Sequence, residues 1–175
     1  EMQDLVIGTK TLPQDQWLKV RAFSWMTGLL HFNKLLQIPL ILLPRQTGAP
    51  YHEMIEMFME VNSAEFPLIG EIRDFFLERA KLLQNGGPEF HHSPEWLGIL
   101  WPDDEYIFIR LATEGKLDNF YEESKKILSS IISSVDAESD LEILYEALKV
   151  NQALIKLPNQ PEDGEIETQY NILDV

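Results

Sequence analysis

Residues 21–43, RAFSWMTGLLHFNKLLQIPLILL, form a long apolar stretch that any predicted fold must accommodate. It is apolar enough to suggest a membrane span, yet polar residues interrupt it at regular intervals. A helix turns 100° per residue and would gather the apolar side chains on one face. That face holds Leu18, Ala22, Trp25, Leu29, Phe32 and Leu36. The opposite side carries Ser24, Thr27, His31 and Lys34.

This polar side argues against a membrane span. Lys34 alone would cost about 2.5 to 3.5 kcal/mol at a bilayer centre. In a protein core, by contrast, burial of each large apolar side chain contributes roughly 1.5 to 3 kcal/mol. We therefore expect a core helix over about 13–37, which Pro39 and Pro44 kink or end.

Further helical periods follow along the chain. Apolar residues recur every three or four positions over 51–61, 66–83, 117–131 and 141–155. Two more helix starts are predicted where a proline precedes or joins acidic residues, because proline suits the first turn and acids suit the positive end of a helix. These starts are Ser93-Pro94-Glu95 and Pro102-Asp103-Asp104-Glu105.

The two ends of the chain predict strands. Residues 165–172 alternate polar and apolar side chains, which is the pattern of a strand with one wet face. Residues 4–8, DLVIG, are the other candidate strand. The predicted fold is therefore mainly α, a bundle of about six helices with a small two-stranded β-ribbon formed by the N- and C-terminal segments.

Length and charge narrow the class of protein. The 175 residues predict a single domain over 1–175, and the net charge of −15 gives no electrostatic basis for binding nucleic acid. The absence of cysteine excludes disulfides, thiolate zinc sites and a cluster held by this chain's own thiolates. No signal-peptide pattern opens the sequence, so we expect a cytoplasmic protein. Because it begins at Glu1, we also expect a segment excised from a larger protein.

Common catalytic motifs are missing, since the sequence has no phosphate-binding glycine loop, GxSxG or HExxH. No catalytic or cofactor-binding residue is predicted. Two weak groups of candidate site residues remain. The first consists of possible metal ligands in one loop, which are Glu89, His91, His92 and Glu95. The second is a seam that would face a pocket or a partner, made of Ser24, Thr27, His31, Lys34 and His52.

The chain is also rich in tryptophan and methionine. Trp17, Trp25, Trp96 and Trp101 recur with Met54, Met57 and Met59. Core filling explains most of this density, because these residues follow helical spacing. A groove for a lipid or a partner helix is the alternative.

Two segments resemble a known family when they are taken together. They are WLKVRAFSWMTGLLHFNKLLQIPLILL, residues 17–43, and ALKVNQALIKLPNQPEDGEIETQYNI, residues 147–172. Both resemble the region C-terminal to the catalytic core in B12-binding radical SAM proteins. The resemblance implies an accessory domain of a parent enzyme that carries a 4Fe-4S cluster, S-adenosylmethionine and possibly cobalamin. The family's CxxxCxxC loop has no counterpart here, so no cofactor ligand is carried over to this chain.

These observations predict a non-catalytic helical domain that flanks or caps a catalytic core. Its expected partner is the catalytic domain of the same polypeptide, with no nucleic acid and no membrane span. Two alternatives stay open. One is a free-standing acidic protein-interaction module, and the other is a helical-bundle domain that binds a small molecule.

Overall fold

The computed structural model describes residues 4–132, 137–157 and 164–172. Seven α-helices lie within these residues, accompanied by one π-helical turn, one 3-10 turn and a small antiparallel sheet. The predicted mainly helical class is confirmed. The α-helices are α1 Gln14–Thr27, α2 Gln37–Thr47, α3 Tyr51–Met59, α4 Pro67–Gln84, α5 Asp103–Thr113, α6 Leu117–Ser129 and α7 Ala137–Ala153.

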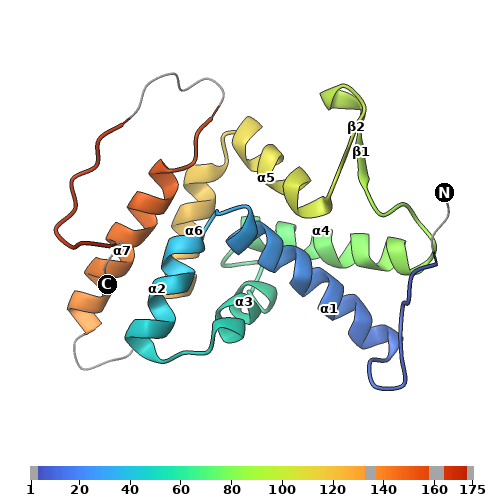
Figure 1. Cartoon of the computed structure of the whole chain (residues 1–175), viewed down its shortest axis with the longest axis horizontal. Helices are drawn as coiled ribbons and strands as arrows, with labels where there is room; N and C mark the ends of the chain where they lie inside the picture. Colours follow the sequence, from blue (N-terminus) through green and yellow to red (C-terminus); the bar gives the residue numbers. More distant parts are fainter. Residues whose placement is uncertain (1–3, 133–136, 158–163, 173–175) are drawn as a thin grey trace.

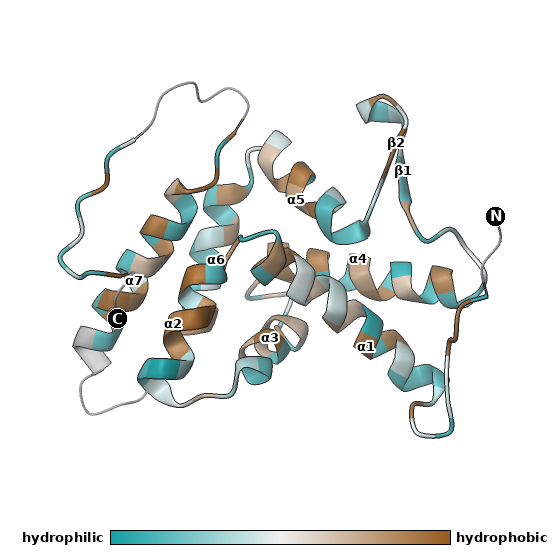
Figure 2. Cartoon of the chain, in the orientation of Figure 1, coloured by the Kyte–Doolittle hydropathy of each residue, from teal (hydrophilic) through white to brown (hydrophobic). Residues whose placement is uncertain are grey.

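The helices form two groups around one main core (Figure 1). At one end α1 lies against α4 and α3, and at the other α7 packs on α2 and α6. Both α6 and α5 reach back to α4, so the groups share buried side chains. Figure 2 shows that hydrophobic residues dominate α2, in line with its central position.

The predicted helix over 13–37 is wrong in its length. The α-helix ends at Thr27 and continues as a π-helical turn, Gly28–Phe32 (η1). After a short break the chain enters α2 at an angle of 97°. A π-turn holds more residues per turn than an α-helix, so it rotates the following side chains away from the predicted face. Phe32, assigned to the buried face, is therefore 72% exposed, whereas Trp25 and Leu29 are buried as predicted.

Two distant side chains hold the break before α2. The Asn151 amide Nδ2 donates to the Lys34 carbonyl at 2.9 Å and to the Leu35 carbonyl at 2.7 Å, and Asn151 Oδ1 accepts from Ile38 N at 2.9 Å. The Tyr121 hydroxyl also donates to Leu35 O, at 2.6 Å. Burial raises the pKa of that hydroxyl, so it remains a donor. These bonds satisfy backbone groups that the broken helix leaves unpaired.

The two prolines in this region do not end a helix. Pro39 lies in the first turn of α2, where its missing N–H has no intrahelical partner to lose. Pro44 lies inside α2, which continues to Thr47. The helix ends at Gly48, whose φ of 72° is the left-handed conformation that glycine adopts at low cost.

α3 and α4 confirm the predicted helices over 51–61 and 66–83 to within a few residues. The N-cap residue of α4, Phe66, makes no side-chain hydrogen bond to the first turn of the helix. Instead, Glu123 of α6 accepts hydrogen bonds from Leu68 N at 3.1 Å and Ile69 N at 2.9 Å. A buried carboxylate is therefore stabilised by the positive end of a helix more than fifty residues away in sequence.

The predicted ribbon of the chain ends is wrong. The strands are β1 His91–Ser93 and β2 Ile99–Trp101, and neither 4–12 nor 164–172 contains a strand. Residues 164–172 run along α7 instead, where Glu146 accepts hydrogen bonds from Gln169 N and Tyr170 N. The carboxylate supplies the acceptors that a neighbouring strand would have supplied.

The α-helix predicted to start at Ser93-Pro94-Glu95 is also wrong. A single 3-10 turn, Pro94–Trp96 (η2), joins β1 to β2. The second predicted start, by contrast, begins α5 at Asp103.

No single helix in the described parts of the chain is long and apolar enough to cross a membrane. The bent pair Gln14–Phe32 and Gln37–Thr47 meets that test by length and composition only when it is taken together. Leu29, Leu30, Leu40 and Leu43 of this pair are fully buried in the main core. The apolar side chains of residues 21–43 therefore form part of the protein core.

Candidate functional site

A β-hairpin projects from the helical body beside α4 and α5 (Figure 1). We call residues 89–101 the hairpin arm. His91 pairs with Trp101, His92 with Leu100 and Ser93 with Ile99. Because paired residues share a face of the ribbon, His91, Ser93 and Trp101 lie on the face toward the body, and His92 and Leu100 lie on the other face.

The base of the arm is held by a buried ion pair. Asp103, the first residue of α5, is fully buried, and its Oδ1 accepts a hydrogen bond from Arg79 Nε of α4 at 2.7 Å. Arg79 Nη2 also donates to the carbonyl of Pro88, just before the arm, at 3.1 Å. One guanidinium therefore connects α4, α5 and the entry to the arm.

Aromatic rings complete the base. The His91 ring stacks on Tyr106 of α5 at a centroid distance of 3.7 Å, and Trp96 approaches the same tyrosine at 5.4 Å. Phe75 of α4 lies 5.6 Å away on a nearly parallel plane. The arm is therefore packed against both helices.

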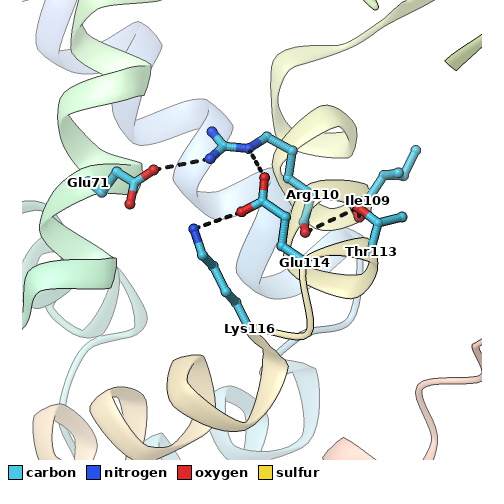
Figure 3. A network of polar contacts seen from close by, with 6 residues as sticks. All are labelled: Glu71, Ile109, Arg110, Thr113, Glu114 and Lys116. Carbon is cyan, nitrogen blue, oxygen red and sulfur yellow. Dashed lines mark hydrogen bonds and ion pairs between the residues drawn. The ribbon is translucent and has the colours of Figure 1, made fainter. Parts of the chain in front are cut away.

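A polar network around Arg110 joins α5 to α4 (Figure 3). The Arg110 guanidinium lies 5.8 Å from the Tyr106 ring centre. It donates to Glu71 Oε1 of α4 and to Glu114 Oε1, both at 3.1 Å, and Glu114 Oε2 pairs with Lys116 Nζ at 2.7 Å. Hydrogen bonds from Lys116 and Arg110 lower the pKa of Glu114. The network connects α5 to α4, the two helices against which the arm packs.

Burial shifts the pKa of Asp103 and the pKa of His91 at the base of the arm. It raises the pKa of Asp103, although the hydrogen bond from Arg79 opposes that shift. Burial also lowers the pKa of His91, and the charge of Arg79 adds to that effect. His91 is therefore mostly neutral near pH 7 and packs as an aromatic ring.

The combination of Ser93, His91 and Asp103 does not form a catalytic relay. His91 Nδ1 is 4.0 Å from Asp103 Oδ1, which is beyond hydrogen-bond distance, and that oxygen is already bound to Arg79. Ser93 is fully buried, and its hydroxyl has no recorded partner among the described residues. A catalytic nucleophile needs a general base within hydrogen-bond distance and access to substrate. We therefore assign these three residues a structural role where the arm meets the helices.

The predicted metal ligands point to different surroundings. Glu89 pairs with Arg21 of α1 at 3.4 Å, His91 packs on Tyr106, and His92 and Glu95 are exposed. No group of three or more His, Asp or Glu side chains able to hold a metal ion occurs in the described residues. Metal binding by these four side chains stays a prediction.

The predicted polar seam is divided by the break after α1. Ser24 is exposed, and the Thr27 hydroxyl donates to Phe23 O of its own helix. His31 lies in the π-turn, with its ring 5.6 Å from Tyr51, whereas Lys34 and His52 are exposed. The five residues therefore lie on α1, in the π-turn, in the break that follows it and on α3, and not along one straight helix.

Sequence reasoning missed the apolar surface of the arm. Leu97, in the turn, is 94% exposed, and Leu100 on the outer face is 60% exposed. Phe90 is also exposed, and Ile99, which pairs with Ser93 on the inner face, is only partly covered by the body. Leu97 has a φ of 60°, which is uncommon for a leucine, and Gly98 follows at 67°. Gly98, directly before the apolar run Ile99–Trp101, was the available signal for a turn at this position.

Taken together, these features define a small helical domain with a firmly based, apolar hairpin arm. No family model matches the chain, and no curated protein or solved structure matches it.

Proposed function

We propose that this chain is a non-catalytic helical accessory domain that docks onto a catalytic domain through the hairpin arm. The observation that carries this proposal is the exposure of Leu97 and Leu100 on an arm whose base is buried. Large apolar side chains that gather on one projecting element are typical of protein interaction sites.

The energetic argument favours a partner that covers the arm. Burial of an exposed leucine contributes roughly 1.5 to 3 kcal/mol. The left-handed backbone of Leu97 costs about 1 to 2 kcal/mol in comparison with an ordinary conformation. Docking would bury the Leu97 side chain and so offset the cost of its left-handed backbone. The buried bond between Arg79 and Asp103 keeps the arm in place, so little ordering entropy is lost on binding.

The resemblance to B12-binding radical SAM proteins supplies the proposed partner, which is the catalytic domain of the same polypeptide. The cluster, S-adenosylmethionine and any cobalamin would belong to other parts of that parent protein. This chain would contribute its packing surface and no ligand.

The parent reading frame provides the first test. We expect a CxxxCxxC motif upstream of residue 1 in the same polypeptide. A reading frame that encodes these residues alone would remove the proposed parent enzyme.

A photo-crosslinking experiment on the full polypeptide tests the docking surface. Leu97 is replaced by the photoreactive residue p-benzoylphenylalanine, and crosslinked peptides are mapped by mass spectrometry. We expect crosslinks from position 97 to the catalytic domain. Leu154 is the matched control, because it is also an exposed leucine but follows α7. Equal crosslinking from positions 97 and 154, or none from 97, would contradict the proposed docking role of the arm.

The second candidate function is a free-standing acidic interaction module. The net charge of −15 favours it, since a strongly acidic surface attracts basic partners. This candidate requires a native start codon close to residue 1, which the same reading frame would reveal.

A further inference from the structure

A groove lies between α1, α3 and α4, away from the hairpin arm. It has a volume of about 490 Å³. α1 contributes Lys19, Val20 and Phe23, α3 contributes Glu56 and Met59, Glu60 follows α3, and α4 contributes Leu77. The floor is apolar because Phe23, Met59 and Leu77 pack against the main core. The lining includes two acidic residues and one basic residue.

The acidic side of the groove belongs to α3. Glu53 and Glu56 lie three residues apart on one face of this helix, and Glu60 directly follows its last residue. All three are exposed, and their side chains make no ion pair or hydrogen bond within the described parts of the chain. Neighbouring like charges repel one another, and a basic ligand would relieve that repulsion.

Methionines give the groove an adaptable wall. Met59 lines it, and Met57 lines a neighbouring hollow of about 530 Å³ that shares Glu60. Phe66 and Ile127 extend the apolar surface of that hollow. Methionine fits irregular partners because its side chain is flexible and polarizable, and it is frequent where proteins bind helices. The two hollows therefore adjoin at Glu60, near the end of α3.

We propose that this groove binds an amphipathic helix with basic residues along its edge, supplied by a protein partner. The apolar face of such a helix would contact Phe23, Met59 and Leu77. Its lysines or arginines would meet Glu56 and Glu60. An anionic lipid surface fits less well, since the same acids and the net charge of −15 repel its headgroups. This inference does not depend on the docking role of the arm.

A pair of model peptides tests the groove on the whole chain. The first is a helix-forming peptide of leucine and lysine about 18 residues long, or five helical turns. The second has the same leucine pattern, with glutamate in place of lysine. We expect calorimetry to detect saturable binding of the lysine peptide and none of the glutamate peptide.

Variants then locate the binding surface. The double variant Glu56→Lys/Glu60→Lys reverses two charges at the groove and should weaken lysine-peptide binding about tenfold or more. Glu105→Lys/Glu122→Lys is the matched control, because it makes the same change in net charge at exposed residues that do not line the groove. Val20→Asp should also weaken binding, since it places a charge on the apolar lining. These positions are exposed, so circular dichroism should show a folded protein in every case.

Equal weakening by the two double variants would overturn the proposal, because binding would then reflect net charge alone. Binding of both peptides with similar affinity would overturn it too. Saturable binding of neutral lipid vesicles that is abolished by Val20→Asp, without binding of the lysine peptide, would assign the groove to lipid and contradict a helical partner.

Discussion

Buried polar side chains tie distant helices together. Glu123, Asn151 and Asp103 are almost completely removed from solvent, and each is bound to a different part of the backbone or to an arginine. Burial of a polar group is unfavourable unless its hydrogen bonds are made, so these residues require their partners in place. They therefore define which helices can pack together.

Substitution of Glu123 tests the contribution of a buried polar side chain to stability. Glu123→Ala removes the acceptor for Leu68 N and Ile69 N and leaves two buried donors at the start of α4. We expect the free energy of unfolding to fall by about 2 to 3 kcal/mol in urea denaturation. Glu122→Ala, next to it on an exposed position of α6, should change that free energy by no more than about 0.5 kcal/mol. Similar effects of the two substitutions would contradict a capping role for Glu123.

Residue patterns predicted apolar burial better than polar burial. Ala22, Trp25, Leu29 and Leu36 were assigned to the core and are buried. The buried state of Glu123 was not predicted, because it depends on the start of α4 more than fifty positions earlier. A local period reports which side chains share a helix face, but it contains no information on which other backbone meets that face.

The break between α1 and α2 shows how elements constrain one another. Gly28 begins the π-turn where α5 approaches, and a Cβ atom on Gly28 would lie 2.5 Å from Asp104 Oδ2. The same oxygen accepts a hydrogen bond from Asn33 Nδ2 at 3.1 Å. A side chain at position 28 would displace the carboxylate and break the bond that holds the end of this turn.

Gly28→Ala is therefore expected to destabilise the protein. We predict a loss of about 1 to 2 kcal/mol in the free energy of unfolding, after the gain in helix propensity that alanine brings. Gly164→Ala is the control, since no atom of the described residues, apart from its chain neighbours, lies within 4 Å of the position its Cβ would take. A chemical denaturation curve measures both. Stability of Gly28→Ala equal to or above that of the parent sequence would show that α5 can move away at no cost.

The hairpin arm shows that residues typical of a helix start do not always begin a helix. Ser93, Pro94 and Glu95 match the start of a helix, yet Ser93 ends β1, and Pro94 and Glu95 belong to a single 3-10 turn. The following residues Leu97 and Gly98 adopt left-handed conformations that an α-helix cannot contain. Packing of His91 and Trp96 on Tyr106 then holds the ribbon against α5. A three-residue strand has little stability of its own, so its formation depends on that packing.

Across the molecule, the described C-terminal segment closes a second, smaller core. Ile172 packs with Leu42 of α2 and Ala147 of α7. The Tyr170 hydroxyl donates to Glu142 at 2.9 Å, and Glu146 accepts the two backbone N–H groups beside it. The segment is attached by one buried side chain and a few exposed hydrogen bonds, so it should open more easily than the main core.

Ile172→Ala tests this order of stability. We expect amide hydrogen exchange at Gln169 and Tyr170 to become about tenfold faster, whereas amides in the middle of α4 keep their rates. The reason is that loss of the buried side chain weakens the attachment of the segment without disturbing the main core. Val6→Ala, at an exposed position near the other end, should leave both rates unchanged. Faster exchange throughout α4 would mean that the two cores open together.

Local patterns of side chains predicted a mainly helical protein, the positions of α3, α4, α5, α6 and α7, and the burial of several apolar residues of α1. Those properties depend on contacts three or four residues apart, which a local period records. The π-turn, the ribbon at residues 91–101 and the attachment of the C-terminal segment to α7 became visible only in the folded protein. Each depends on groups far apart in the chain, such as Asn151 with Leu35 or Asp104 with Asn33, and their energies arise only when the helices pack.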